Sequence, residues 1–280
     1  PGPAGRRRMG RIVIGLTGGI GSGKSAARRW LEALGCVGID ADKMAHLAYK
    51  AGTPGHACIV AEFGSKVVDA AGEIDRRALG GIVFGSPDAR RRLERIVWPR
   101  IADVVASAIE HVGEGRNLDG SEAAAPPGGT VWLPADSPDA CDRPAAVSTL
   151  ARAISAASPG PAGEVAEPGD VDLAGAGLVR AEAPRPIVVL EAAVLLEAGW
   201  DAAADVVWST FVDRERAVER ILGRDGHARD EAERRIDAQM SIGARLRRSS
   251  SAFDTSGQVA RTRADLALAL GELARANGRP

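Results

Sequence analysis

Residues 18–25 read Gly-Gly-Ile-Gly-Ser-Gly-Lys-Ser and match the G-x-x-x-x-G-K-[ST] pattern of a phosphate-binding loop. An apolar, β-prone segment precedes the loop at 11–17, and residues 25–34 follow it with Trp30 and Leu34 at helical spacing. Between a strand and a helix, the glycines let backbone N–H groups face a phosphate, and the helix N-terminus adds the positive end of its dipole. The pattern therefore predicts an α/β core that binds a nucleoside triphosphate.

The residues of the loop have separate expected roles. Those expected to contact the phosphates are Gly18, Gly19, Ile20, Gly21, Ser22, Gly23, Lys24 and Ser25. The Lys24 ammonium is expected to reach the β- and γ-phosphates and to assist catalysis, and the Ser25 hydroxyl is expected to bind Mg²⁺. No cluster of His and Cys side chains at ligand spacing predicts any other metal site.

Composition narrows the class of protein. The chain has 280 residues, and 36 basic residues against 37 acidic ones give a net charge of −1, which offers no reason to expect nucleic acid as the main partner. The three cysteines are few and far apart, so we expect a reducing compartment, without a choice between cytoplasm and mitochondrion. No apolar run is long enough to predict a membrane helix, and residues 1–10 are expected to form a linker or tail.

The order of apolar segments predicts a three-layer α/β domain over residues 11–280. Strands are expected at 12–16, 37–39, 187–190 and 206–212. Amphipathic stretches that predict helices lie between and beyond these strands, at 25–34, 42–50, 55–63, 75–83, 87–111, 214–223, 229–240 and 259–275. Alternating strands and helices favour a parallel sheet with helices on both faces.

Residues 113–184 interrupt this alternation. They are rich in Gly, Ala, Pro and Ser, and contain Ala-Pro-Pro-Gly-Gly and Ser-Pro-Gly-Pro-Ala-Gly. Such a composition buries little apolar area against the entropy lost on ordering, so the stretch is expected to be a disordered, inert insertion, with a functional lid as the alternative. Within it, residues 148–157 could form one short helix, and Val131–Leu133 could pin the loop locally.

Three acidic residues follow expected strands at the edge where ligands bind in an open α/β sheet. Asp40 and Asp42 come after the strand at 37–39, and Glu191 ends the strand at 187–190. One of the two aspartates is expected to take a proton from an attacking hydroxyl, although Asp42 could instead cap the next helix. Glu191 is expected to sit near Mg²⁺, with a solvated strand end as the alternative.

A charged turn at 224–235 joins two expected helices. Arg224 and Arg229 within it are candidates to lie over the phosphates, because a guanidinium donates several hydrogen bonds in one plane. A solvated helix surface explains Arg229 and its neighbours equally well. The Asp-Ala-Ala-Gly segment at 69–72 matches the D-x-x-G pattern of GTPases. Because the chain contains no N-K-x-D guanine-binding motif, we interpret this segment as a turn.

Taken in order, these segments resemble the dephospho-CoA kinases. The resemblance is carried by Gly15–Ser25, Ile39–Asp42, Gly72–Leu79, Ile82–Phe84, Arg92–Pro99, Val189–Trp200 and Arg224–Gly226. It covers residues 11–112 and 186–257, and the segment Val189–Trp200 is most similar to the kinase half of animal-type bifunctional CoA synthase. That similarity raises the expectation of an adenylyltransferase domain upstream.

The resemblance implies a P-loop nucleotide kinase fold with a helical lid. It also implies transfer of the ATP γ-phosphoryl group to the ribose 3′-hydroxyl of dephospho-CoA, with Asp42 as the general base and Arg224 as the lid arginine. The substrate contacts that it implies are Asp40, Arg76, Trp98, Pro99 and Arg245. One departure stands at Glu191, where the family usually has Asp. The alternatives are a kinase of another nucleoside or nucleotide, or a nucleotide-binding switch module.

Overall fold

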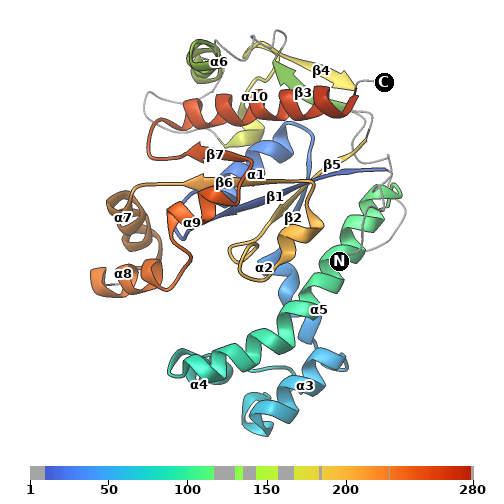
Figure 1. The fold of residues 1–280 in the computed structure, drawn as a ribbon, viewed down its shortest axis with the longest axis vertical. Coiled ribbons are helices and arrows are strands. Elements are labelled where there is room, and N and C mark those ends of the chain that lie inside the picture. The colour runs from blue at the N-terminus through green and yellow to red at the C-terminus, as the bar shows by residue number, and fades with distance from the viewer. Residues whose placement is uncertain are drawn as a thin grey trace.

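A computed structural model describes residues 10–116, 130–134, 143–156, 167–182, 185–226 and 228–278 of the chain. The tail expected at 1–10 therefore falls outside the described residues except for Gly10. Within the described residues, the chain forms a parallel sheet with helices on both faces (Figure 1). This confirms the fold class predicted from the alternating pattern.

The central sheet has five strands in the order β2-β5-β1-β6-β7, and all neighbouring pairs are parallel. The strands are β1 Ile12–Gly18, β2 Val37–Asp40, β5 Ile187–Glu191, β6 Val206–Phe211 and β7 Ser251–Asp254. Four of them occupy the predicted segments, whereas β7 was not predicted. In the β5 register, Glu191 pairs with Leu16 of β1 and with Asp40 of β2, so the ends of these strands meet at one edge.

The helices follow the predicted stretches closely. They are α1 Lys24–Ala33, α2 Ala41–Met44, α3 Pro54–Phe63, α4 Arg76–Phe84, α5 Pro87–Gly113, α6 Arg143–Ala156, α7 Arg214–Asp225, α8 Arg229–Asp237, α9 Ile242–Arg247 and α10 Val259–Gly278. Of these, α9 was not predicted, and α6 is longer than the one short helix considered for residues 148–157. None of the helices in the described ranges combines the length and the apolar composition that crossing a membrane requires.

Alternation along the strands divides the apolar side chains between two cores. Ile12 and Ile14 of β1 pack with α1 and α10 on one face, whereas Val13 packs with Val188 and the C-terminal half of α5 on the other. Successive side chains of a strand point to opposite faces, so a strand covered on both sides reads as a continuous apolar run. Every residue of β1 and β5 is buried, which is why these two strands were the easiest to predict.

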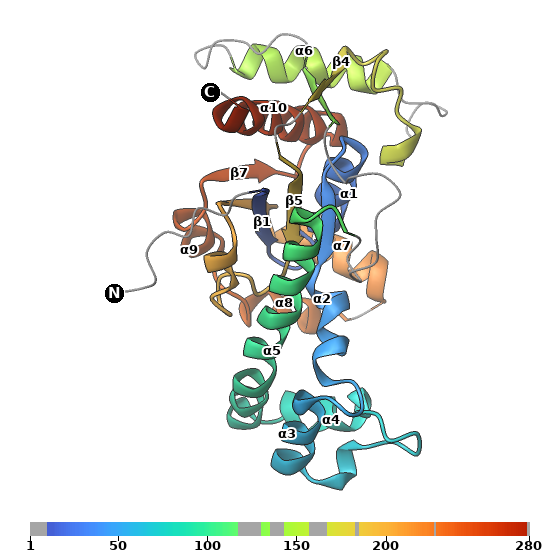
Figure 2. The same ribbon diagram turned by 90° about the vertical axis from the view of Figure 1, so that its right-hand side faces the viewer.

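A helical arm extends from the sheet. It consists of α3, α4 and the first half of α5, which project together below the sheet (Figures 1 and 2). The arm has an apolar cluster of its own, with Ile59, Phe63 and Leu79 buried at its centre. The second half of α5 packs on the sheet through Ile101, so one continuous helix connects the arm to the core.

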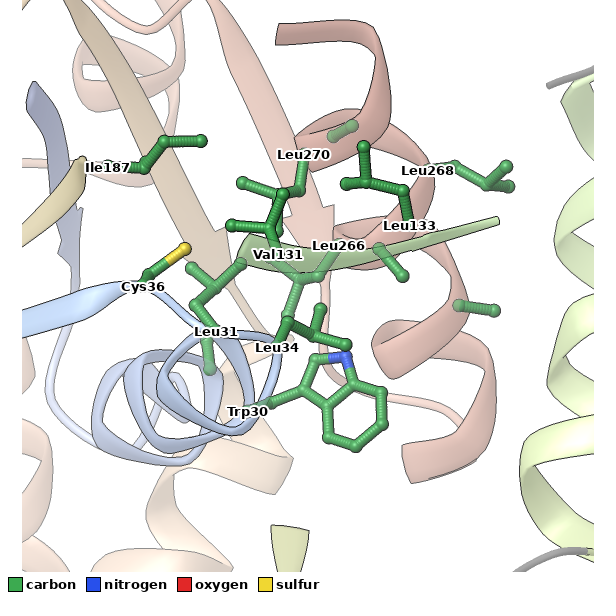
Figure 3. Close-up of a cluster of buried hydrophobic side chains, with 14 of the residues drawn as sticks. Trp30, Leu31, Leu34, Cys36, Val131, Leu133, Ile187, Leu266, Leu268 and Leu270 are labelled. Carbon is green, nitrogen blue, oxygen red and sulfur yellow. The ribbon is translucent and has the colours of Figure 1, made fainter. Parts of the chain in front are cut away.

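The disorder expected for residues 113–184 is wrong for the parts that the structure describes. Strands β3 Thr130–Pro134 and β4 Leu178–Glu182 form an antiparallel pair, and α6 packs against α10 (Figures 1 and 2). Figure 3 shows Val131 and Leu133 of β3 beside Leu266, Leu268 and Leu270 of α10. The buried apolar side chains in the described parts of this stretch belong to one core cluster with α10, and their burial offsets the entropy lost on ordering these parts.

Ile154→Ala is expected to lower the free energy of unfolding by about 2–5 kcal/mol, because truncating a fully buried Ile leaves a cavity. The Ile154 side chain has 0% exposure inside the core shared with α10. Ser155→Ala is the matched control on the same helix, since Ser155 is exposed and its substitution should change stability by less than about 0.5 kcal/mol. Chemical denaturation measures both variants, and equal stabilities would mean that α6 is detached in solution.

Candidate active site

The phosphate-binding loop has the backbone that the sequence pattern predicts. Gly21 and Gly23 adopt φ of +74° and +77°, a region that side chains rarely enter, and Gly23 is the N-cap of α1. A Cβ on Gly18 would lie 2.4 Å from the Ser22 Oγ and 2.5 Å from the Thr210 carbonyl oxygen. The glycines therefore allow both the turn of the loop and its close approach to β6.

Neighbouring elements hold the loop in place. The Ser22 and Thr210 hydroxyls are 2.9 Å apart, and the Thr255 hydroxyl lies 3.0 Å from the Ser22 carbonyl oxygen. The Arg220 guanidinium of α7 donates to the Gly21 carbonyl at 2.9 Å and to the Thr255 carbonyl at 2.5 Å. Sequence reasoning missed Arg220 and Thr255, because their positions carry no signal until β7 and α7 are seen beside the loop.

Lys24 begins α1 and turns back along the loop. Its Nζ donates to the Gly19 carbonyl oxygen over 3.4 Å, which places the ammonium at the Gly19 end of the loop. Burial lowers the pKa of Lys24, although the carboxylates of Glu191 and Asp42 act in the opposite direction. The ammonium is therefore a partly desolvated cation between two acids, and its electrostatic effect on a phosphate is stronger than in bulk water.

Ser25 and Glu191 are brought together as the sequence predicted. The Ser25 hydroxyl donates to Oε1 of Glu191 at 2.7 Å, and the Arg28 Nε donates to Oε2 of the same carboxylate at 2.7 Å. Arg28 also pairs with Glu32 at 2.6 Å. Glu191 is only 4% exposed, so the expectation of a solvated strand end does not describe it.

Asp40 and Asp42 have different surroundings. The Asp40 side chain accepts from the Lys43 backbone N–H at 3.1 Å and caps α2, so the alternative of Asp42 as the cap is wrong. Asp42 lies in the first turn of α2, with its side chain open to solvent. The protein around it still raises its pKa, chiefly by desolvation, while the Lys24 ammonium opposes that shift. A carboxylate with a raised pKa beside the phosphate loop is suited to accept a proton.

Arg245 is a buried cation next to the loop. Its side chain is 3% exposed, and its Nη2 lies 3.5 Å from Oε1 of Glu197. The Arg245 Nε and the Glu197 Oε2 are buried without a hydrogen-bond partner, and burial lowers the pKa of Arg245. A Cβ on Gly19 would lie 3.5 Å from Nη1, so this guanidinium has donors available toward the phosphate site.

Arg224 lies in the last turn of α7, and Gly226 ends that helix with φ of +65°. The Arg224 side chain is exposed, and its charge acts on Lys24, lowering the pKa of that ammonium. Arg229 instead pairs with Glu215 at 2.5 Å and with Glu233 at 3.0 Å on the surface of α8. Of the two candidates in the charged turn, Arg224 is therefore the one coupled to the site.

The remaining expected substrate contacts lie in the helical arm or beside it. Arg76 begins α4, where its guanidinium carbon lies 5.9 Å from the centroid of the Tyr49 ring. Trp98 and Pro99 of α5 line a cavity of about 750 Å³ together with Trp200, whose Nε1 donates to the Trp98 carbonyl oxygen at 3.2 Å. This cavity shares no lining residue with the phosphate loop.

The comparisons with known proteins agree on one family. The family described as "Dephospho-CoA kinase" matches residues 12–117 and 177–261. The curated dephospho-CoA kinases of Geobacter sulfurreducens and Geobacter metallireducens are each 34% identical to this chain. The alignments cover 88% of this chain in both cases, and 90% and 89% of those proteins. These relatives are matched along most of their own length, so they lend no support to an animal-type bifunctional arrangement.

Two solved structures share the fold. A crystal structure from Thermus thermophilus has a TM-score of 0.59 and 23% identity, and covers 94% of this chain and 98% of its own. The dephospho-CoA kinase from Campylobacter jejuni has a TM-score of 0.54 and 18% identity, and covers 95% of this chain and 99% of its own. At these identities the likeness bears on the fold alone.

Proposed function

Since this chain belongs to the dephospho-CoA kinase family, we propose that it transfers the γ-phosphoryl group of ATP to the ribose 3′-hydroxyl of dephospho-CoA, as the last step of CoA biosynthesis. The observation that carries this proposal is the convergence of Lys24, Asp42 and the Ser25–Glu191 pair at one edge of the sheet. These are the parts that phosphoryl transfer needs: an electrostatic anchor, a base and hard oxygen ligands.

In the proposed reaction, Asp42 accepts the proton of the ribose hydroxyl as its oxygen attacks the γ-phosphorus. A bond forms between that oxygen and phosphorus, and the bond to the β–γ bridging oxygen breaks, which leaves CoA and ADP. Lys24 stabilises the charge on the transferring group, since its ammonium is already desolvated and aimed along the loop. Arg245 and Arg224 are proposed to bind the phosphates, Arg224 from a lid formed by α7 and α8.

The residues at the edge fit a magnesium ion. A hydroxyl oxygen and a carboxylate oxygen lie side by side at Ser25 and Glu191, and Mg²⁺ is usually bound through one or two such ligands plus phosphates and water. When bound, the ion would neutralise negative charge on the β- and γ-phosphates. The residues proposed to contact the acceptor are Asp40, Arg76, Trp98 and Pro99, which lie along the side of the molecule that carries the helical arm.

Glu191→Gln is expected to raise the Mg²⁺ concentration for half-maximal activity by about 10–100-fold, because an amide oxygen is a weaker ligand than a carboxylate. Glu32→Gln is the matched control, since Glu32 also bonds Arg28 but does not touch Ser25. Magnesium titrations of initial rates separate the two variants. If both variants shift the magnesium requirement equally, the effect comes through Arg28 and Glu191 is not a ligand.

The activity itself is tested by ADP release with a panel of acceptors: dephospho-CoA, AMP and nucleosides. The proposal expects the highest kcat/KM for dephospho-CoA. A higher value for AMP or a nucleoside would favour a different small-molecule kinase. ADP release that no acceptor stimulates would favour a nucleotide-binding switch.

A further inference from the structure

A buried ion network lies next to the proposed magnesium ligands. Arg28 of α1 stands four residues after Lys24, and its side chain is only 11% exposed. Its Nε donates to Oε2 of Glu191 at 2.7 Å, and its Nη1 donates to Oε1 of Glu32 at 2.6 Å. The third nitrogen, Nη2, lies 3.9 Å from Oδ2 of Asp40. One guanidinium therefore connects α1 with the ends of β5 and β2.

The local sequence provides the space that this network needs. A Cβ on Gly38 of β2 would lie 2.0 Å from Oε1 of Glu32, so the Glu32 carboxylate occupies this position only because a glycine faces it. Glu32 and Arg28 are four residues apart on α1, which places the two side chains on one face of the helix. Glu32 thus holds one nitrogen of Arg28 while another bonds to Glu191, and the two contacts together restrict rotation of the guanidinium.

Glu191 is held at both of its carboxylate oxygens. Oε2 accepts from Arg28, whereas Oε1 accepts from the Ser25 hydroxyl at 2.7 Å. A glutamate side chain has several rotatable bonds, so without Arg28 the carboxylate would be free to turn away from Ser25. The Ser25 hydroxyl directs its proton to Glu191, which leaves its lone pairs for another partner. The contact with Arg28 therefore determines where both proposed magnesium ligands lie.

The charges at this edge of the sheet also require a fixed cation. Glu191 is 4% exposed, and a buried carboxylate is unfavourable unless it is paired and hydrogen-bonded. The pKa of Asp42, which is raised chiefly by desolvation, is raised further by the charges of Asp40 and Glu191. Lys24 is a second cation near Glu191, but the proposed reaction needs its ammonium at the phosphates. Arg28 can pair with Glu191 without that conflict, because its nitrogens face carboxylates of the protein itself.

We propose that Arg28 is a positioning residue for phosphoryl transfer. It holds the Glu191 carboxylate, and through that carboxylate the Ser25 hydroxyl, in the place from which the two side chains bind magnesium. Arg28 itself contacts neither the ion nor the nucleotide. The inference rests on the proposed function, because it concerns the metal site of the same reaction.

The test compares the dissociation constants of ADP in EDTA and in saturating magnesium, measured by calorimetry without acceptor. Their ratio reports how much the ion contributes to binding, and it involves no turnover. In Arg28→Ala this ratio is expected to fall about tenfold, because replacing a residue that orients a metal-binding side chain typically lowers metal affinity by about 10–100-fold. The affinity for ADP in EDTA should stay close to that of the wild type.

Arg29→Ala is the matched control for this measurement. Arg29 is the neighbouring arginine on α1, but its side chain is 52% exposed and its Nε lies 4.0 Å from Glu167, away from the metal site. Its replacement should leave the ratio unchanged. An equal fall of the ratio in both arginine variants would overturn the inference.

A double variant tests whether Arg28 acts through Glu191. Glu191→Gln should also lower the ratio, because it weakens the ligand itself. Adding Arg28→Ala to Glu191→Gln should lower the ratio no further, since the carboxylate that Arg28 holds is already absent. If the two losses multiply instead, Arg28 acts independently of Glu191 and the inference is overturned.

A further variant covers the case in which Arg28→Ala does not fold, since it leaves the buried Glu191 carboxylate without this cation. Arg28→Lys keeps a positive charge there, but an ammonium lacks the planar fork, so the ratio should still fall by about threefold or more. An unchanged ratio in folded Arg28→Ala, or in Arg28→Lys if only that variant folds, overturns the inference. If the wild type does not phosphorylate dephospho-CoA while Arg28→Ala lowers the ratio, the proposed function fails and the role of Arg28 at the metal site stands.

Discussion

Lys24→Ala is expected to lower kcat by about 10²–10³-fold or more while the protein stays folded. Removing one preorganised hydrogen-bond donor that stabilises a transition state lowers kcat by a factor of that size. Lys24 also carries a full positive charge, so its removal should lower kcat at least as much. The cost in stability should be small, because the contact that the ammonium makes with the Gly19 carbonyl oxygen is long, at 3.4 Å. Its burial, which lowers its pKa, is unfavourable to the charged form in the free protein.

The measurement is kcat with saturating ATP and dephospho-CoA, together with a thermal denaturation curve. Lys43→Ala serves as the control, since Lys43 is another lysine on the same edge, 77% exposed and paired with Asp40 at 3.6 Å. Near-wild-type turnover by Lys24→Ala would mean that the loop does not hold the transferring phosphate.

Asp42→Asn is expected to lower kcat by about 10²–10⁴-fold with little change in the KM for ATP, because an amide cannot accept a proton. The cap of α2 survives in this variant, since Asp40 provides it. For the wild type, kcat should rise with pH through the raised pKa of Asp42, as only the carboxylate form can act as the base. That rise should disappear in Asp42→Asn.

Stability gives an independent control for Asp42→Asn. The folded-state pKa of Asp42 is raised above the ordinary value of an aspartate, so the folded protein holds this proton more tightly than the unfolded chain does. The contribution of Asp42 to stability therefore falls as the pH rises from the unfolded pKa through the folded one. At neutral pH, Asp42→Asn should leave Tm unchanged or raise it. A lower Tm, or a kcat within a few-fold of wild type, would contradict the assignment of Asp42 as base.

The sheet centre and the loop could be predicted from the sequence because their signals are local. Every residue of β1 is buried, so the strand reads as an apolar run, and the glycine pattern follows it directly. β7 gave no such signal, since Phe253 is its only buried residue. Position in the sequence made Asp40 and Asp42 candidate bases, and Arg224 and Arg229 candidate phosphate contacts. The resemblance to the kinase family selected Asp42 as base and Arg224 as lid residue, roles that stay predictions.

The insertion was misjudged for a physical reason. Its buried residues, such as Val131, Ile154 and Leu178, are scattered among Gly, Ala and Pro, so the sequence offers little local signal beyond one possible short helix at 148–157. The surface that they cover belongs largely to α10, which begins at Val259 and therefore lies far along the chain from α6 and from β4. An estimate from composition counts only the apolar area within the stretch itself, and it does not include the apolar surface of a helix that is distant in the sequence. Arg220 and Thr255 were missed for the same reason.

The most direct test of the central claim is the identity of the product formed from ATP and dephospho-CoA, followed by ³¹P NMR and mass spectrometry. The account predicts ADP and CoA in equal amounts, with the new phosphomonoester on the ribose 3′-oxygen. Release of ADP together with inorganic phosphate, or phosphorylation at any other position of the acceptor, would contradict it.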